Sequence, residues 1–291
     1  MRGLIHGFGK GSPMRNKRWI REPFVITGVF MVIGLCLAAA LAPLFASPTA
    51  QNLSARLSDP GAGSFILGSD HFGRDLLARI VWGARISLRV GIIASSISLV
   101  IGVLLGTIAG YFGGKIDSLI MRLTDVMMGF PPLLFLIAIA AAFEPGINTA
   151  MLAIGLVSWP SMARLTRGQV MTIMSREYVL AGTAMGYSHI RLMANHVLPN
   201  CIAPLLVAFS LGISGAIMAE ASLSFLGLGV QAPDASWGVM INEGKDFLRV
   251  APWISIFPGI AIALAVLGFN LLGEGLRDAL DVKSELKIKN K

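Results

Sequence analysis

Long apolar stretches recur along this chain and alternate with shorter segments that contain glycine, proline or charged residues. The stretch from Phe24 to Ala46 is the clearest, because its 23 residues include no Asp, Glu, Lys or Arg. A helix needs about 20 mostly apolar residues to cross a bilayer. The pattern therefore predicts an all-α membrane protein with six spanning helices, at residues 24–46, 86–112, 116–143, 147–169, 199–226 and 252–272.

The composition agrees with a membrane location. Of the 291 residues 55% are hydrophobic and only 14% are charged, whereas soluble domains average about 25% charged residues. A soluble domain of this size could not cover its surface with so few charges, and a disordered chain would hold far less apolar material. Cys36 and Cys201 both lie in apolar stretches, so no structural disulfide is expected.

The positions of the basic residues predict the orientation. With the N-terminus in the cytoplasm, 17 Lys and Arg residues fall on the inner side and 7 on the outer side. Cytoplasmic segments carry an excess of Lys and Arg, so both termini are expected to be cytoplasmic. The net charge of +8 is then mainly a topology signal. Because no motif interleaves the basic residues with aromatic ones, no nucleic-acid partner is expected.

This topology divides the chain into segments of different exposure. Two outer segments, 47–85 and 227–251, each include an amphipathic stretch, at 75–82 and 237–248. In full, the expected segments are a basic cytoplasmic N-terminus at 1–23, the first spanning helix at 24–46, a periplasmic segment at 47–85, a five-helix core at 86–281 with a long cytoplasmic loop at 170–198, and a cytoplasmic tail at 282–291.

Few ionisable residues lie at depth in the predicted spans. Asp125 follows Asp117 by eight residues, which is about 12 Å along a helix axis. A carboxylate at that depth faces the bundle interior or water rather than lipid. Glu220 lies near the outer end of the fifth span, where it could reach the membrane interface. Asp125 and Glu220 are therefore candidates for lining a passage, and Asp125 is expected to be structural or water-facing rather than a proton carrier.

A charged motif lies in the first outer segment, beside the amphipathic stretch. It contains Asp70, Arg74 and Asp75. We expect it to order this segment through local ion pairs and helix capping, with Asp70 or Asp75 near a helix start. We expect these pairs to be exposed, so that each contributes only about 0–1 kcal/mol and single neutral substitutions weaken uptake modestly. Direct contact with a substrate is the alternative.

Catalytic and metal-binding patterns are missing from the sequence. The four histidines lie outside the spans and are too scattered for a metal cluster. A Walker A loop requires a glycine five residues before its Gly-Lys pair, and no Gly-Lys pair here has one. The chain is therefore not expected to be an enzyme or to hold a cofactor. Energy for active work would enter from a partner or an ion gradient.

Small residues and prolines predict how the spans pack and bend. Ala94, Ser98, Gly102, Gly106 and Gly110 recur at every fourth position, so they form one helix stripe that another helix can approach closely. The Phe-Pro-Pro sequence at 130–132 and the Trp-Pro sequence at 159–160 are expected to break or kink the third and fourth spans.

The most informative stretch is residues 175–200 in the long cytoplasmic loop. Its pattern predicts a helix, a tight turn at Gly186, and a second helix that ends before Pro199. Ala181, Ala184 and Met185 lie on one side of the first helix. Apolar residues exposed in such a loop indicate that another protein covers them.

This loop resembles the cytoplasmic loop of bacterial ABC-importer permeases, whose pattern is Glu-Ala-Ala, three residues, Gly, and later Leu-Pro. The matching positions are Ala181, Gly186, Leu198 and Pro199, while Leu180 replaces the Glu and Gly182 the second Ala. Residues 67–88, 221–238 and 269–281 are similar to the dipeptide/oligopeptide/nickel subfamily, in particular its second, shorter permease subunit.

The resemblance implies a type I ABC importer permease in the bacterial inner membrane. Its implied partners are a second, homologous permease, two cytoplasmic ATPases that bind ATP and Mg, and an extracytoplasmic solute-binding protein. The implied ATPase-coupling residues are Tyr178, Ala181, Gly182, Gly186, Leu198 and Pro199.

Three alternatives remain open from the sequence. A short peptide is the expected substrate, and nickel or a nickel chelate is the alternative within the subfamily. An ion-driven secondary transporter would show an inverted repeat and several deep ionisable groups, and the sequence shows neither. A membrane scaffold without transport activity is the third alternative.

The predicted topology can be tested by cysteine labelling with a membrane-impermeant reagent. In a variant without Cys36 and Cys201, we expect Ser58→Cys to react in intact cells and Ser284→Cys to react only after the cells are opened. The expectation follows from the uneven distribution of basic residues. Reaction at position 284 but not at position 58 in intact cells would contradict it.

Overall fold

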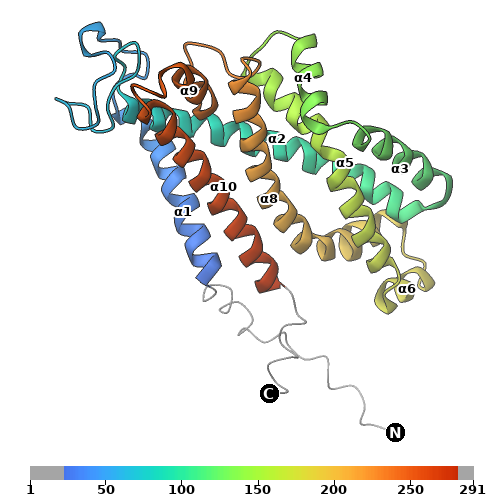
Figure 1. Ribbon diagram of the computed structural model, residues 1–291. Coiled ribbons are helices and arrows are strands. Elements are labelled where there is room, and N and C mark those ends of the chain that lie inside the picture. Colours follow the sequence, from blue (N-terminus) through green and yellow to red (C-terminus); the bar gives the residue numbers. More distant parts are fainter. Residues whose placement is uncertain (1–22, 281–291) are drawn as a thin grey trace.

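The computed structural model describes residues 23–280, and this part of the chain is helical without a β-strand (Figure 1). The expected all-α fold is confirmed, whereas the expected N-terminal segment up to residue 22 and the tail at 282–291 lie outside the described residues. The helices are α1 (Pro23–Leu41), α2 (Leu76–Phe112), α3 (Gly114–Met128), α4 (Pro132–Ala142), α5 (Ile147–Met174), α6 (Glu177–Ala184), α7 (His189–Leu192), α8 (Leu198–Phe225), α9 (Trp237–Gly244) and α10 (Trp253–Leu280).

Four helical stretches in the described range are long and apolar enough to cross a membrane. They are Pro23–Leu44, Leu76–Phe112, His189–Phe225 and Trp253–Asp278. The bent pair of α3 and α4 would make a fifth span if it crosses as one unit. Helix α5 has 28 residues, but its apolar face is interrupted by serines, Pro160 and two arginines. The count of six spans therefore stays a prediction.

The two proline sites behave differently. Helices α3 and α4 are bent by 87° across a short break, and Pro132 begins α4, where its missing N–H is not needed. The expected break in the third span is therefore confirmed. Pro160 lies inside the continuous helix α5, so the fourth span does not break there, and a kink at this position stays a prediction. Pro160 is buried in the bundle, where neighbouring helices can hold a helix together despite a lost hydrogen bond.

Helices α2 and α5 form the most extensive helix pair, and glycines make their close approach possible. A Cβ atom added to Gly102 would lie 2.5 Å from Cβ of Met162, and one added to Gly110 would lie 2.8 Å from the carbonyl oxygen of Arg167. The same addition at Gly106 would overlap α5 at Ala163. The stripe of small residues therefore packs on α5, as the four-residue spacing predicts.

The start of α2 corrects the expected boundary at residue 86. The helix begins at Leu76, so the amphipathic stretch at 75–82 is its first part. Asp75 caps this helix, because its Oδ1 accepts a hydrogen bond of 2.9 Å from the backbone N–H of Leu77. Leu76, Ala78 and Arg79 are buried in the first turn. Burial of this turn against neighbouring segments explains why the helix extends beyond the purely apolar residues.

The remaining helices place residues 47–75 and helix α6 at opposite ends of the molecule. Helix α1 lies beside α10, which packs on α8 and α9. In Figure 1, residues 47–75 and α9 lie at one end, whereas α6, the start of α1 and the end of α10 lie at the other. Leu76, Ile217, Trp237 and Ile254 share a buried apolar cluster at the α9 end, which joins α2, α8, α9 and α10.

Candidate functional site

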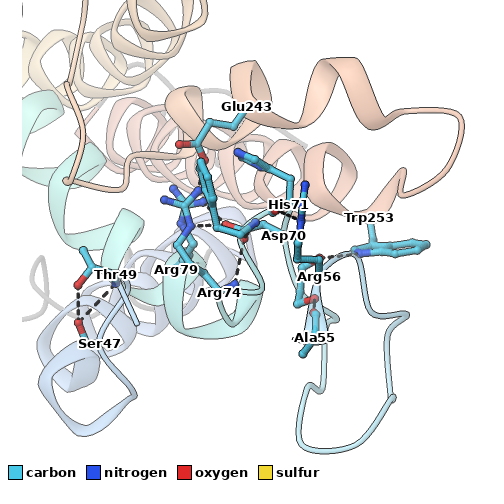
Figure 2. Close-up of polar contacts among 12 residues, drawn as sticks. Ser47, Thr49, Ala55, Arg56, Asp70, His71, Arg74, Arg79, Glu243 and Trp253 are labelled. Atoms are coloured by element: carbon cyan, nitrogen blue, oxygen red, sulfur yellow. Dashed lines mark hydrogen bonds and ion pairs between the residues drawn. The ribbon is translucent and has the colours of Figure 1, made fainter. Parts of the chain in front are cut away.

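A buried network of ion pairs fastens the first outer segment to the bundle. Asp70 Oδ2 accepts hydrogen bonds of 2.5 Å from both Arg74 Nε and Arg79 Nη1. Glu243 of α9 accepts from the same two arginines, at 2.9 Å from Arg74 and 2.6 Å from Arg79. Figure 2 shows the two guanidinium groups between the two carboxylates. The network thus joins residues 70–74, the first turns of α2, and α9.

The motif Asp70, Arg74 and Asp75 therefore forms local ion pairs and a helix cap, as expected from the sequence. Its predicted exposure is wrong, however, because Asp70 is fully buried and Arg79 is 1% exposed. Breaking a buried pair costs about 3–5 kcal/mol, far more than an exposed one. Asp70 and Arg74 bind each other, so their side chains stabilise the folded conformation of residues 70–74.

Hydrogen bonds and positive charge keep Asp70 ionised. Burial opposes ionisation, but the backbone N–H of Arg74 and the guanidinium groups of Arg79 and Arg74 outweigh it, so the pKa of Asp70 lies below its ordinary value of 3.8. Because the folded pKa is lower than the unfolded one, ionised Asp70 stabilises the fold above about pH 3.8. That stabilisation is lost as the pH falls through the lowered pKa.

His71 lies beside this network. Its ring stacks on Phe247 at a centroid distance of 5.2 Å, and burial lowers its pKa. Donor atoms of Asp70, His71 and Glu243 all lie within 4.8 Å of one another, a spacing that could suit a metal ion. Both carboxylates already bind two guanidinium groups. That positive charge opposes a cation at this position.

Glu220 forms a second buried polar group near the same end of the bundle. It is fully buried, with Oε1 accepting 2.7 Å from Ser224 Oγ and Oε2 accepting 3.2 Å from Ser87 Oγ. The backbone N–H of Trp237, at the start of α9, donates to Ser87 Oγ at 3.4 Å. The expectation that Glu220 reaches the interface or lines a passage is therefore wrong, because its carboxylate links α2, α8 and α9.

Asp125 lies on α3 and forms an ion pair with Arg164 of α5, at 2.6 Å between Oδ1 and Nη2. Its side chain is 65% exposed, so it is accessible to water in the isolated chain. A second pair joins the same two helices, between Asp117 and Arg167. The pairs place α3 along α5, and a passage-lining role for Asp125 stays a prediction.

At the opposite end of the bundle, residues 175–200 form the expected helix, turn and helix. Helix α6 ends in a tight turn in which Gly186 N–H donates to the carbonyl of Thr183 at 3.0 Å and Tyr187 N–H to that of Gly182 at 3.1 Å. This pair of bonds is a Schellman motif, which requires a left-handed residue after the helix. Gly186 supplies it with φ of +75°.

Two details of this loop differ from the sequence prediction. The second helix does not end before Pro199, because α7 continues through a π-helical turn at Met193–Val197 into α8. Pro199 lies in the first turn of α8, and the wider π turn, which uses hydrogen bonds five residues apart, carries the chain past it. Gly182, which the resemblance implies is a coupling residue and should therefore face a partner, faces into the bundle instead, since a Cβ there would lie 3.0 Å from Leu192 Cδ2.

Apolar side chains are exposed on α6 and α7. Tyr178, Leu180, Met185 and Ile190 are 46%, 56%, 65% and 76% exposed. On the other side of α6, Val179 is fully buried in a cluster that includes residues of α5, α7 and α8. Leu198 is half-buried and Pro199 is exposed. The segment is therefore anchored to the bundle on one face and apolar on the other, as a partner-binding element requires.

Comparisons with known proteins identify the family. Residues 102–284 match the family described as "Binding-protein-dependent transport system inner membrane component". The chain belongs to this family. It is a permease subunit of an ABC importer, a multi-pass membrane protein that works with other subunits of the transporter and has no ATPase site of its own.

Individual relatives and solved structures agree with this assignment. The chain is 44% identical to dipeptide transport system permease protein DppC of Alkalihalophilus pseudofirmus, over 94% of this chain and 90% of that protein. It is 43% identical to DppC of Haemophilus influenzae, over 89% and 90%. The fold is similar to the MetNI methionine ABC transporter in inward-facing conformations, with a TM-score of 0.57 at 15% identity over 69% of this chain and 95% of that chain. An amino acid ABC transporter gives 0.54 at 17% identity, over 67% and 91%.

Sequence reasoning missed Arg79 and Glu243, which complete the outer network. Arg79 lies in the amphipathic stretch among residues that become buried. The sequence could have indicated its role only through the presence of a charged residue on an otherwise apolar helix face. Glu243 lies 164 residues further along the chain, and no local pattern connects the two. The partners of Glu220 and Asp125 were missed for the same reason.

The outer network yields a prediction about stability. Asp70→Asn removes one negative charge and leaves two buried arginines undercompensated, so we expect a loss of about 3–5 kcal/mol. Asp59→Asn is the matched control, because Asp59 is exposed in the same outer segment. The measurement is the thermal unfolding midpoint of each variant, purified in detergent. Equal midpoints for the two variants would show that the network does not stabilise the outer segment.

Proposed function

We propose that this chain is the permease subunit of an ATP-driven importer of dipeptides or short oligopeptides in the bacterial cytoplasmic membrane. The observation that carries the proposal is the 44% identity to a dipeptide transport permease over 94% of the chain. A permease of Escherichia coli named as a probable D,D-dipeptide transporter is 40% identical over 90% of the chain. These relatives support a peptide substrate rather than nickel or a nickel chelate.

The proposed assembly contains this chain, a second homologous permease, two cytoplasmic ABC ATPases and an extracytoplasmic solute-binding protein. ATP and Mg are bound by the ATPases. The exposed apolar residues Tyr178, Leu180 and Met185 support an ATPase contact at α6, because covering them removes apolar surface from water. Leu180 replaces the glutamate of the general permease pattern, so the contact at this position is apolar rather than ionic.

The packing of α6 supports a mechanical role for this contact. Val179 of α6 shares one buried cluster with Ile173 of α5, Leu192 of α7 and Cys201 of α8. Packed clusters shift as units rather than deforming continuously. Movement of an ATPase bound at α6 would therefore pass to the ends of α5 and α8, the helices that continue into the bundle.

An ion-driven transporter is the rival from another class. It would require several exchangeable ionisable groups at depth. Asp125 is paired with Arg164, and Glu220 is enclosed by serines. Neither arrangement supports a relay of protons, and no observation favours this rival over the importer.

Reconstitution tests the proposed function. The chain is purified with a co-expressed second permease and two ATPases and placed in liposomes with the solute-binding protein outside. We expect ATP hydrolysis to rise when the binding protein carries a dipeptide, and labelled dipeptide to accumulate only with ATP. Accumulation driven by a proton or sodium gradient without ATP would contradict the proposal, as would ATP-driven uptake of nickel but not of dipeptides.

The coupling role of α6 yields a second prediction. Ala181 is exposed on α6, so Ala181→Trp should hold the ATPase away, whereas Ala181→Ser should not. Gly186→Val places a β-branched residue at a positive φ, which strains the turn. Gly186→Asn is the matched control, because asparagine adopts a positive φ more readily. We expect the Trp and Val variants to insert normally but to lose ATPase co-purification or to uncouple hydrolysis from uptake. Full assembly and normal uptake in both would remove the coupling assignment.

A further inference from the structure

The ring of Tyr187 lies where helix α6, helix α7 and the π-helical turn at Met193–Val197 meet. Arg191 of α7 places its guanidinium carbon 4.2 Å from the centroid of this ring, within the reach of about 6 Å for a cation–π contact. The imidazole of His196, in the π-helical turn, stacks on the same ring at a centroid distance of 5.9 Å and an interplanar angle of 21°. One side chain thus contacts both elements that follow α6.

Tyr187 contacts α6 itself through Gly182. A Cβ atom added to Gly182 would lie 3.3 Å from Cδ2 and 3.7 Å from Cε2 of the Tyr187 ring, so one edge of the ring packs directly on the α6 backbone. The backbone N–H of Tyr187 also donates to the carbonyl of Gly182 at 3.1 Å. Gly182 stands where the general permease pattern has its second alanine. The absent methyl group leaves the space that the ring fills.

This contact determines how firmly α6 is held. The buried residues of this eight-residue helix are Val179 and Gly182. If Val179 alone joined α6 to the bundle, the helix could pivot there, because the turn that follows contains Gly186 at a φ of +75°, and glycine restricts the backbone least. Contact of Tyr187 and Leu192 with Gly182 provides a second fixed point about one turn away on the same face. Two fixed points define the direction of a helix.

We propose that Tyr187 is a positioning residue for coupling, whose ring keeps α6 at a fixed angle to α7 and to the start of α8. The inference rests on the proposed function, in which an ATPase binds α6, and it adds the side chain through which movement leaves that helix. With the ring in place, movement of α6 carries α7 and the π-helical turn with it as one rigid body. Without the ring, the turn at Gly186 bends and part of the movement is lost.

Binding of the ATPase and positioning of α6 depend on different faces of this segment. Tyr178, Leu180 and Met185 are exposed and remain available to an ATPase. Tyr187 is half-buried and packs against the buried cluster that contains Val179. Removal of the Tyr187 ring therefore leaves the exposed apolar residues in place. The expected defect is uncoupling, in which the ATPases stay bound and hydrolyse ATP but less dipeptide is imported.

The test measures the ratio of ATP hydrolysed to dipeptide imported by the reconstituted complex. Tyr187→Ala removes the ring, and we expect this ratio to rise about two- to tenfold, since an aromatic contact changes an equilibrium by a factor of this size. The ATPases should still co-purify with the variant. Tyr187→Phe is the matched control, because it keeps the ring beside Arg191 and His196. Its ratio should equal that of the unmodified complex.

A pair of substitutions tests whether the ring acts through Gly182. Gly182→Ala alone places a methyl group 3.3 Å from the Tyr187 ring, so we expect it to displace the ring and to raise the ratio. In the double variant Gly182→Ala, Tyr187→Ala, the methyl group instead contacts Leu192 and restores a second fixed point on α6. The double variant should therefore couple better than Tyr187→Ala alone. Simple addition of the two single effects would contradict the proposal.

The outcomes separate this inference from the proposed function. If the unmodified complex imports no dipeptide with ATP, the proposed function fails and the inference fails with it. If import is normal but Tyr187→Ala keeps the ratio unchanged, only the positioning role is wrong. Loss of the ATPases from Tyr187→Ala would make the residue part of the binding surface, and a parallel fall of hydrolysis, uptake and thermal stability would make it merely structural. Either result overturns the proposal, as does an equal defect in Tyr187→Phe.

Discussion

The close contact between α2 and α5 is the constraint on which the rest of the structure depends. Apolar helix faces gain little by leaving lipid, so helices in a membrane associate mainly through packing and short approach distances. Gly102, Gly106 and Gly110 allow α5 to approach the α2 backbone. The first turn of α2 contributes Arg79 to the outer ion network, and α5 leads directly into α6. One helix pair therefore connects the end of the molecule that holds the ion network to the end that carries α6.

The two ends of the molecule differ in how their side chains are satisfied. At the outer end, Asp70, Arg79 and Glu243 neutralise one another in a buried site, so this part of the structure is fixed within the chain. At the other end, Leu180 and Met185 leave apolar surface exposed, which is the arrangement expected of a surface that binds another subunit. This division agrees with the proposed function, in which the ion-paired end stays ordered while the end at α6 receives movement from a bound partner.

Local patterns predicted much of the fold, and long-range partners explain the rest. Apolar runs located the long helices, Pro131 and Pro132 predicted the break between α3 and α4, and the four-residue glycine spacing predicted a close helix neighbour. The sequence could not predict that α2 begins at Leu76, because that turn is stabilised by burial against distant segments. It also could not predict the burial of Glu220, whose partner Ser87 lies 133 residues away.

The most direct test of this account is a comparison of two glycine variants on the same helix pair. Alanine favours helix over glycine by about 1 kcal/mol, so Gly168→Ala on α5, where an added Cβ meets no atom within 4 Å, should keep or raise thermal stability and keep ATP-driven uptake. Gly106→Ala should lower both, because its Cβ would push α2 and α5 apart at Ala163. Equal stability and uptake in the two variants would contradict the claim that this contact organises the permease.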